Sequence, residues 1–491
     1  MKGVLTLAHY IKQDIREYAG NPLIEALPPI LTEEVAVELI SNLPQPVDPE
    51  ELALEGATRL HCIDRLRTVV QPFLLHLDLE AQFSLLIRRG YVGRNPTSPE
   101  TVRHLHSLSG TQRYNGGFKS TAETFTIVGL SGIGKSTALH AILSLYPQTI
   151  RHERYDGKQF IHTQITWLKL DCPRDGSLAG FCLQFFHAVG KALGDENYYK
   201  RFRYRNIEDA VKQMEQVAST FFIGALLIDE LQNLRLAKTG GKDNMLTFFL
   251  NLVNNIGIPV VFSGTNSMIT MFSEVMRIAR RVCGIGTIEF RRFEQDDDEW
   301  RMLVSNLWSY QWCRQAAELT DEIYDVLYEY TQGVTDFLVK LLVLSQRYAI
   351  QSGLECVTAE IIERVSNSKM QILKPALSAL RSRDPNRMKQ FDDLLPIEDQ
   401  LLEMMALDGL PRTERLALLR GVGHRVKEAT STSASDSTAC PPQENQPSIA
   451  VAVETSELKA LIEHEAPLDA LRDAGWLNND LFEFSPTYRK G

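Results

Sequence analysis

Cysteine is scarce in this chain, and no two cysteines stand at a spacing typical of a metal site. The 491 residues contain seven cysteines. None of them forms a Cys-x-x-Cys pair, and their spacing is irregular. The sequence therefore predicts neither a zinc site nor a disulfide framework, and isolated thiols of this kind are typical of a reducing compartment.

Long apolar runs are also missing. No run reaches the roughly 18 apolar residues that are needed to cross a bilayer. Near the amino terminus, Lys12, Asp14 and Arg16 interrupt the stretch where a signal peptide needs continuous apolar residues. We therefore expect a cytoplasmic protein that does not enter a membrane.

The chain lacks an excess of positive charge. Its formal net charge is −10 at pH 7. This balance excludes a protein that coats nucleic acid with its whole surface, but it leaves room for a local basic patch. With 44% hydrophobic and 23% charged residues, the composition is that of an ordinary globular protein.

Short apolar runs alternate with helical patterns between residues 120 and 292. Most of the runs are apolar on both faces, as expected for parallel strands that are covered on both sides. This alternation predicts an α/β fold, with a three-layer core around a parallel sheet. The expected strands are Thr124–Val128, Ile165–Leu170, Gly224–Ile228, Pro259–Ser263 and Thr287–Phe290, and the expected helices are Lys135–Leu145, Leu178–Leu193, Ile207–Thr220, Asn244–Asn255 and Met268–Arg281.

The segments on either side of this core have a different character. Residues 1–119 are irregular, punctuated by proline and partly helical, which predicts an N-terminal accessory region. Residues 293–380 show helical periodicity without strands and predict a helical lid, and residues 381–426 predict a helical extension. The helices expected in the lid are Glu299–Trp312, Asp321–Tyr330, Thr335–Ile350 and Thr358–Asn367, with Thr320 and Thr358 as N-caps.

The carboxyl-terminal part of the chain begins with a segment that cannot bury a core. Residues 427–455 are rich in Ser, Thr, Ala and Pro and predict a flexible linker. Apolar residues return in residues 456–491. That last segment is equally consistent with a docking peptide that orders on a partner and with a terminal helix that returns to the body of the protein.

A glycine-rich loop follows the first expected strand. The run TFTIVGLSGIGKST places Gly-x-x-x-x-Gly-Lys-Ser between a strand and a helix, the pattern of a P-loop. Backbone N–H groups in such a loop bind phosphates, the Lys135 ammonium reaches the β- and γ-phosphates, and the Ser136 hydroxyl is a ligand for Mg²⁺. The residues predicted to contact ATP are Gly129, Leu130, Ser131, Gly132, Ile133, Gly134, Lys135, Ser136 and Thr137.

Two further strands end in polar residues. The strand in Gly224–Glu230 ends at Asp229, predicted to hold Mg²⁺ through a water, and at Glu230, predicted to polarise the attacking water. The strand in Ile258–Asn266 ends at Thr265 and Asn266, which can report the state of the γ-phosphate. A polar strand terminus without such a role accounts for this second pattern as well.

Three arginines recur at helical spacing in Met268–Arg281. Arg277, Arg280 and Arg281 fall on one face of the expected helix. A guanidinium on this face can stabilise the γ-phosphate bound by a neighbouring subunit, as an arginine finger does. Arg280 and Arg281 are the preferred candidates, and a solvated basic face is the alternative.

Together these motifs resemble those of AAA+ ATPases, and within that class the chain is similar to TnsC, the regulator ATPase of Tn-seven-type transposons, and more distantly to TniB. The narrowest signals are NPLIEALPP and RRGYVGRNP. The segments that carry the resemblance are Asn21–Pro29, Arg88–Pro96, the P-loop, Leu168–Leu178, Leu226–Leu234, Ser263–Thr265, Arg277–Arg281 and Gln332–Leu341.

The resemblance implies a specific activity. Proteins of this type bind ATP, assemble on double-stranded DNA as rings or filaments, and connect a target-site selector to the transposase; hydrolysis limits the assembly. It also implies a bacterial cytoplasm and gives Thr265 or Asn266 the role called sensor one. Lys340 falls where the lid residue called sensor two is expected. That position is usually arginine, and a surface pair with Asp336 explains Lys340 equally well.

Three basic segments are candidates for DNA contact. In Tyr198–Arg205 cations alternate with aromatic residues, which suits phosphate attraction and stacking. Arg151–Phe160 lies between the first two expected strands, and Arg235–Lys242 follows Glu230. An ordinary solvated surface is an equally good reading of each. The individual candidates are Arg151, Arg154, Lys158, Lys200, Arg201, Arg203 and Arg205.

Two other classes of protein share the same core. A STAND-like signalling NTPase normally carries a repeat domain, and no period of about 20–50 residues is visible here. A helicase loader is compatible with the P-loop core. Nucleotide-dependent binding of duplex DNA distinguishes the transposition regulator from both.

Overall fold

The computed structural model describes residues 5–103, 120–173, 175, 177–203, 205–236, 245–246, 248–249, 252–268, 286–382 and 384. The chain divides into two compact units, Met1–Ser433 and Ala434–Gly491. All of the described residues belong to the first unit. The predictions for the extension beyond residue 384, for the linker 427–455 and for residues 456–491 lie outside the described residues. So do those for Arg277, Arg280 and Arg281.

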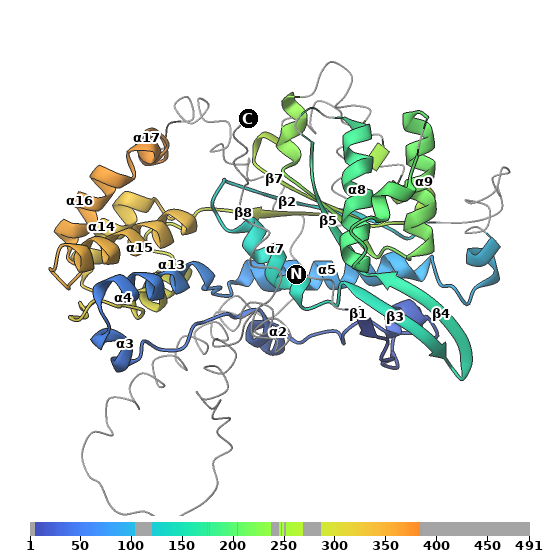
Figure 1. The fold of residues 1–491 in the computed structure, drawn as a ribbon, viewed down its shortest axis with the longest axis horizontal. Coiled ribbons are helices and arrows are strands. Elements are labelled where there is room, and N and C mark those ends of the chain that lie inside the picture. The colour runs from blue at the N-terminus through green and yellow to red at the C-terminus, as the bar shows by residue number, and fades with distance from the viewer. Residues whose placement is uncertain are drawn as a thin grey trace, which may run out of the picture. The chain divides into compact units, whose positions relative to one another are not determined.

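A five-stranded parallel sheet forms the centre of the fold and confirms the predicted α/β class (Figure 1). The strand order is β5–β6–β7–β2–β8, so the first strand of the core in sequence lies inside the sheet, between the fourth and the fifth. The carboxyl ends of β2, β6 and β7 therefore meet at one edge. The strands are β2 (Thr124–Gly129), β5 (Trp167–Asp171), β6 (Ala225–Asp229), β7 (Val260–Gly264) and β8 (Gly286–Phe290).

Helices cover both faces of this sheet. Leu226 and Ile228 of β6 share an apolar cluster with α8 (Leu178–Leu193) and α9 (Ile207–Thr220). Leu227, which points to the other face, shares a cluster with α7 (Lys135–Ser144) and with α5 (Leu74–Val92) from the N-terminal segment. Strands buried on both faces explain why the β6 sequence is continuously apolar.

A second, three-stranded sheet was not predicted. Its order is β1–β3–β4, formed by β1 (Leu5–Leu7), β3 (Thr149–Tyr155) and β4 (Lys158–Ile165). The antiparallel pair β3–β4 turns at Asp156 and Gly157, both with positive φ (47° and 73°). Because this hairpin buries only some of its side chains, its strands lack the apolar run that marks those of the core.

The described part of the N-terminal segment packs into the same apolar core as α7. Leu23, Leu66, Phe83 and Ile142 of α7 belong to one cluster of buried residues. The elements of this segment that precede α5 are α1 (Pro22–Glu25), α2 (Glu33–Ile40), α3 (Pro49–Ala53), α4 (Gly56–Cys62) and the 3₁₀ helix η1 (Ile63–Thr68).

The two narrow motifs of the N-terminal segment contact each other behind β6. The Asn21 side chain donates to the Tyr91 carbonyl over 2.8 Å, and the Tyr91 hydroxyl donates to the Phe222 carbonyl over 2.8 Å. Arg94 donates to the Ile223 carbonyl over 2.6 Å. A Cβ on Gly224 would lie 2.6 Å from the Tyr91 hydroxyl oxygen, so this close approach requires glycine at the start of the strand.

The helical lid follows β8, as predicted. Thr320 and Thr358 cap helices with their side chains, accepting from Ile323 N and Ile361 N. The first lid helix ends at Trp308, not at Trp312 as predicted, and Trp312 is buried in the loop that follows. The helices are α13 (Asp298–Trp308), α14 (Asp321–Thr331), α15 (Thr335–Gln351), α16 (Ala359–Lys369) and α17 (Lys374–Ser382), with a short 3₁₀ turn η5 (Gln371–Leu373).

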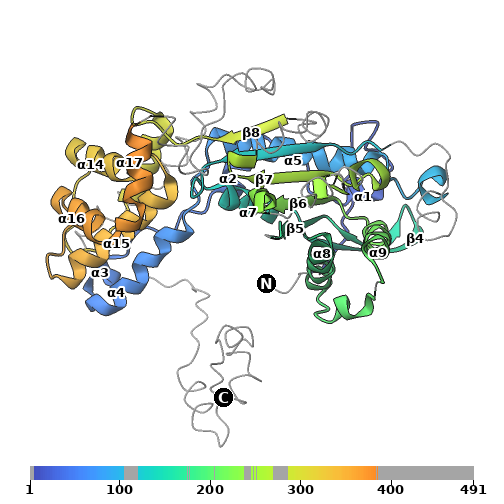
Figure 2. The same cartoon turned by 90° about the horizontal axis from the view of Figure 1, so that it is seen from above.

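The lid is packed against α3 and α4 of the N-terminal segment, which both views show beside α14–α16 and away from α8 and α9 (Figures 1 and 2). A buried ion pair joins the two parts: Arg59 of α4, 1% exposed, donates to both carboxylate oxygens of Glu355. Arg59 also donates to the Trp312 carbonyl over 2.8 Å. In the described part of the chain, no helix is both long and apolar enough to cross a membrane.

Arg59→Met is expected to lower the free energy of unfolding by about 2–4 kcal/mol, because it leaves the Glu355 carboxylate with the Arg314 N–H but no charged partner and removes the donor to a buried carbonyl. Denaturant unfolding followed by tryptophan fluorescence measures the change. The matched control is Arg65→Met, whose side chain is 42% exposed and pairs with Glu51. It should cost about 1 kcal/mol or less. Equal losses in the two variants would contradict the structural role of the buried pair.

Candidate nucleotide-binding site

The P-loop connects β2 to α7 in the strand–loop–helix arrangement that the sequence predicted. Gly132 and Gly134 adopt positive φ values of 78° and 99°, which turn the loop around a central space. Gly134 is the N-cap of α7, so the positive end of the helix faces this space. Loop and helix terminus together form an anion-binding site.

The Lys135 ammonium is folded back onto the loop. It donates to the carbonyl oxygens of Gly129 and Leu130, both over 2.8 Å. These carbonyls are neutral acceptors. The anionic oxygens of a polyphosphate are stronger acceptors for the same ammonium, so phosphate binding is expected to draw Lys135 into the loop.

Asp229 lies at the carboxyl end of β6, opposite the start of α7. Its Oδ2 atom accepts from the Ser136 hydroxyl over 3.3 Å and lies 2.8 Å from Lys169 Nζ of β5. Burial raises the pKa of Asp229, but the Lys169 hydrogen bond and charge, together with the Glu230 N–H, outweigh it and hold the pKa below its usual value. Asp229 is therefore ionised at neutral pH.

The residues present fit a magnesium ion. The Ser136 hydroxyl and the Asp229 carboxylate are hard oxygen donors that converge beside the phosphate loop, and Mg²⁺ is commonly held by one or two such groups together with phosphate and water. A bound Mg²⁺ would neutralise charge on the phosphates. Ser136 and Asp229, the two predicted ligands, are the side chains that would hold it.

Glu230 stands beside Asp229 in a strained backbone conformation. Its φ is +55°, in the left-handed region that non-glycine residues rarely adopt. Gln232 Nε2 donates to Glu230 Oε2 over 2.6 Å, and Gln232 Oε1 accepts from Thr265 N over 3.2 Å. Gln232 therefore links the predicted catalytic carboxylate to the end of β7. Gln232 lies in Leu226–Leu234, one of the segments that carry the resemblance, but the sequence analysis assigned it no role.

Thr265 and Asn266 line the same cavity as the P-loop, because β7 lies between β2 and β6. The Thr265 hydroxyl is hydrogen-bonded to the Ser267 hydroxyl over 2.9 Å. The Asn266 side-chain oxygen is buried without a hydrogen-bond partner among the described residues. Such a polar group beside the phosphate loop suits contact with a phosphate or a water, and its role as sensor one stays a prediction.

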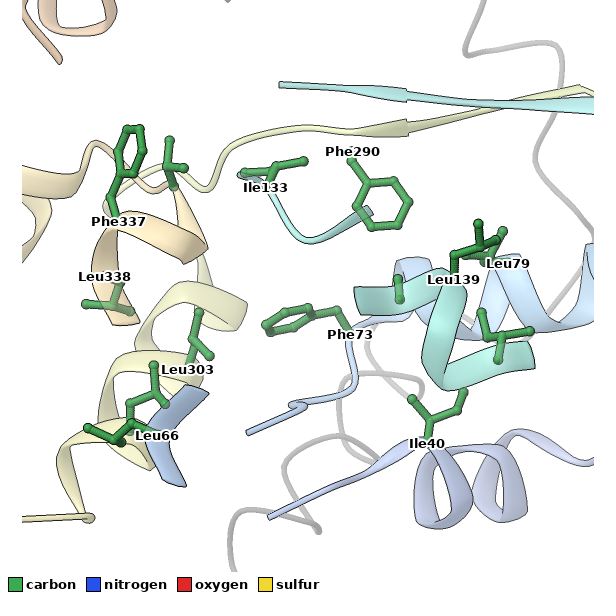
Figure 3. Close-up of a cluster of buried hydrophobic side chains, with 14 of the residues drawn as sticks. Ile40, Leu66, Phe73, Leu79, Ile133, Leu139, Phe290, Leu303, Phe337 and Leu338 are labelled. Carbon is green, nitrogen blue, oxygen red and sulfur yellow. The ribbon is translucent and has the colours of Figure 1, made fainter. Parts of the chain in front are cut away.

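The cavity extends well beyond the phosphate loop and has a volume of about 1170 Å³. It is also lined by Val69, Val70 and Phe73 from the N-terminal segment and by Leu303 and Val339 from the lid. Phe73 lies between Leu303 and Phe290 of β8 (Figure 3). Apolar side chains in the same cavity as a phosphate loop suit a nucleobase. No local motif marks residues 67–76, because tertiary packing alone brings them to the site.

An uncharged imidazole and two arginines also line the cavity. Burial lowers the pKa of His76 to about 4, so the ring is neutral, and its Nδ1 accepts from Phe73 N over 3.2 Å. Arg291 and Arg292 also line the cavity; Arg292 lies 3.6 Å from Glu294. The sequence prediction missed this pair, which directly follows the last core strand.

The lid reaches the phosphate loop through the start of α15. The Thr335 hydroxyl and the Asp336 N–H both donate to the Gly132 carbonyl, over 3.1 and 3.0 Å. Lys340 lines the cavity, and its ammonium pairs with the Asp336 carboxylate. The surface pair is thus present, and the place of Lys340 in the cavity leaves its predicted role as sensor two open to test.

The predicted DNA-contacting residues lie at two places on the surface. Arg151, Arg154 and Lys158 are exposed on the β3–β4 hairpin. Lys200, Arg201, Arg203 and Arg205 are exposed on and after the 3₁₀ helix η2 (Tyr198–Arg201).

Three aromatic residues of Tyr198–Arg205 pack against the protein. The Phe202 ring stacks on Phe186 of α8 at 4.0 Å between ring centroids, and Tyr199 stacks on His187 at 3.9 Å. Tyr198 is buried. These three rings therefore hold the segment on α8 and are not open planes for stacking. The third basic segment, Arg235–Lys242, lies almost wholly outside the described residues.

Residues 119–272 match the AAA domain family. Together with the parallel sheet and the P-loop geometry, this match defines the class of the protein: it is an ATPase with a P-loop AAA core. None of the curated proteins compared with the chain matches it.

Several solved structures resemble the chain at low identity. A Walker-type ATPase of Pyrococcus abyssi is 12% identical with a TM-score of 0.32, over 60% of this chain and 84% of that one. Cdc6p from Pyrobaculum aerophilum is 12% identical with a TM-score of 0.36, over 70% and 98%. Drosophila ORC bound to DNA is 10% identical with a TM-score of 0.34, over 80% and 84%. The assignment to ATPases rests on the AAA domain and the nucleotide site, not on these similarities.

Lys135→Ala is expected to weaken nucleotide binding at least about 100-fold, because it removes the only ammonium that the P-loop motif places among the phosphates. Fluorescence titration with a labelled ADP measures the affinity. Lys340→Ala is the matched comparison within the same cavity: a surface role predicts a change of less than about threefold, and a phosphate-contacting role predicts about tenfold or more. Normal ADP affinity in Lys135→Ala would contradict the assignment of the loop.

Proposed function

We propose that the protein is an ATP-dependent, DNA-binding regulator of DNA transposition. It oligomerises on double-stranded target DNA as a ring or filament and links a target-site selector to the transposase. The N-terminal region 1–119 faces the selector. Hydrolysis of ATP limits the lifetime of the assembly.

The observation that carries this proposal is the contact between Asn21–Pro29 and Arg88–Pro96. These segments give the narrowest resemblance to TnsC-type proteins, and their residues meet through Asn21, Tyr91 and Arg94 against the start of β6. The two segments that carry the resemblance therefore pack together as one unit. The unit also ties the N-terminal segment to the strand that presents Asp229 and Glu230.

Each step of ATP hydrolysis is assigned to residues of this chain. Loop amides and Lys135 hold the phosphates, and Ser136 and Asp229 would hold a magnesium ion, which would neutralise charge on them. The Glu230 carboxylate polarises a water for attack on the γ-phosphate, while Thr265 or Asn266 contacts that phosphate. Arg280 or Arg281 of a neighbouring subunit supplies positive charge to the transition state, which makes turnover depend on assembly.

The exposed cations provide the DNA contacts in this proposal. Each subunit offers few of them, consistent with a net charge of −10. An oligomer that repeats a weak contact along one duplex gains affinity through effective concentration. Phosphate contacts of this kind make binding strongly dependent on salt.

Duplex DNA is expected to bind only when nucleotide is present. Gel shifts with and without a slowly hydrolysed ATP analogue measure this dependence. Arg203→Ala combined with Arg205→Ala should weaken binding uniformly across DNA sequences and reduce the slope of log affinity against log salt by about 2. Lys212→Ala, an exposed lysine of α9, is the control.

Absence of duplex binding at low salt with the analogue would contradict the transposition-regulator function and favour a signalling NTPase. Duplex binding that ignores nucleotide would contradict the proposed coupling between ATP and assembly. Neither result would contradict the assignment of the ATPase site.

Glu230→Gln is expected to retain ATP binding and to lower turnover by a factor of about 10²–10⁴, because the amide cannot accept a proton from water. Phosphate release under saturating ATP measures turnover, and electron microscopy of samples with ATP and DNA shows whether assemblies persist. The variant should form long-lived assemblies. Rapid disassembly with ATP would show that another group activates the water.

A further inference from the structure

Lys169 is a second ammonium at the nucleotide site, separate from the P-loop lysine. It lies on β5, next to β6 in the sheet, with Lys169 in register with Leu227 and Asp171 in register with Asp229. Its side chain is 20% exposed and its Nζ lies 2.8 Å from Asp229 Oδ2. Nothing in the P-loop pattern places a lysine here.

The Lys169 ammonium contacts the Asp229 oxygen that is expected to face the magnesium ion. Asp229 Oδ2 is also the oxygen that accepts from the Ser136 hydroxyl, so this oxygen faces the predicted magnesium position. An ammonium and a hydrated divalent cation compete for the same lone pairs, and they repel each other at such short range. Both cannot occupy this oxygen fully at once.

A buried carboxylate needs a positive partner when no metal is present. The Asp229 side chain is only 5% exposed. An unpaired charge at such a position is strongly destabilising, and Lys169 supplies the compensating charge. The Lys169 ammonium therefore stabilises the ionised form of the Asp229 carboxylate.

A second carboxylate, Asp171, lies on the same strand as Lys169. It lies two residues beyond Lys169 on β5, so the two side chains leave the same face of the sheet. The Asp171 side chain is exposed. Burial and the charge of Lys169 lower the pKa of His140 of α7, while the charges of Asp229 and Asp171 act in the opposite direction.

We propose that Lys169 is a built-in cation that takes the place of Mg²⁺ on Asp229 and exchanges with it. In the metal-free site its ammonium holds Asp229. When Mg²⁺ enters with the nucleotide, the ammonium moves to Asp171. Nucleotide bound without metal uses the Lys169 charge as a partial substitute. This proposal rests on the proposed magnesium role of Ser136 and Asp229.

The test is the metal dependence of ADP affinity, expressed as the dissociation constant in EDTA divided by that in Mg²⁺. Fluorescence titration of the full chain with a labelled ADP gives both constants without turnover. Lys169→Met should raise this ratio about tenfold or more, because it removes a substitute cation in EDTA and a competing one in Mg²⁺. Lys169→Arg keeps the charge and should stay within about threefold of the wild type.

Asp171→Asn supplies an opposite and independent readout. Without the second acceptor the ammonium leaves Asp229 less readily, so the ratio should fall. In the Lys169→Met background the same change should have a much smaller effect, because the two residues then no longer interact. Lys212→Met is the control for loss of one exposed lysine. If Lys169→Met does not fold, as judged by thermal melting, Lys169→Gln replaces it.

The outcomes separate this proposal from the one it rests on. A wild-type affinity that does not depend on Mg²⁺ would overturn the metal role of Ser136 and Asp229, and the Lys169 proposal with it. A metal-dependent wild type with an unchanged ratio in Lys169→Met would overturn the Lys169 proposal alone. Equal effects of Asp171→Asn in both backgrounds would show that Asp171 acts without Lys169.

Discussion

The structure depends on one buried negative charge, the Asp229 carboxylate at the end of β6. A carboxylate so little exposed requires compensating groups, and these come from two neighbouring elements: Ser136 from α7 and Lys169 from β5. In the strand order, β6 lies beside β5, and only β7 separates it from β2, which leads into α7. This order allows both the Lys169 ammonium and the Ser136 hydroxyl to reach Asp229 Oδ2. The phosphate loop and the acidic strand are thereby joined through Asp229.

Around this charge the rest of the site is built by distant parts of the chain. Residues from the segment 67–76 and from the lid contribute apolar side chains to the wall of the cavity. The start of α15 contacts the Gly132 carbonyl of the P-loop. The lid is in turn fixed to α4 through Arg59 and Glu355. A nucleotide in this cavity would touch three parts of the chain at once, so its binding and hydrolysis can change how those parts pack.

The strongest sequence patterns corresponded to elements that are stabilised locally or buried on both faces. The bounds of α8 and α9 were predicted from their helical patterns, and the P-loop and the strand ending at Asp229 were predicted from composition and spacing. The β3–β4 hairpin was missed because it buries only part of its side chains and so lacks a long apolar run. The inward packing of Tyr198, Tyr199 and Phe202 was also missed, because alternation of cations with aromatics looks the same on a surface and at a packed edge.

Partners in the site that come from tertiary contacts could not be predicted in this way. Lys169 and Gln232 lie in segments that carry the family resemblance, but no role was predicted for either of them. Residues 67–76 carry no motif. The sheet order and the packing of the N-terminal segment bring these residues to the site. The motif residues Asn21, Tyr91 and Arg94 show the converse: they were recognisable in sequence, and their contacts are structural rather than chemical.

The most direct test of the central claim is a structure of the protein with Mg²⁺ and a slowly hydrolysed ATP analogue. We predict that the polyphosphate contacts the P-loop, residues 129–137. Lys135 should have left the Gly129 and Leu130 carbonyls for the phosphates, and Asp229 should face the metal. A nucleotide bound elsewhere, or a Lys135 that remains on those carbonyls beside bound phosphate, would contradict it.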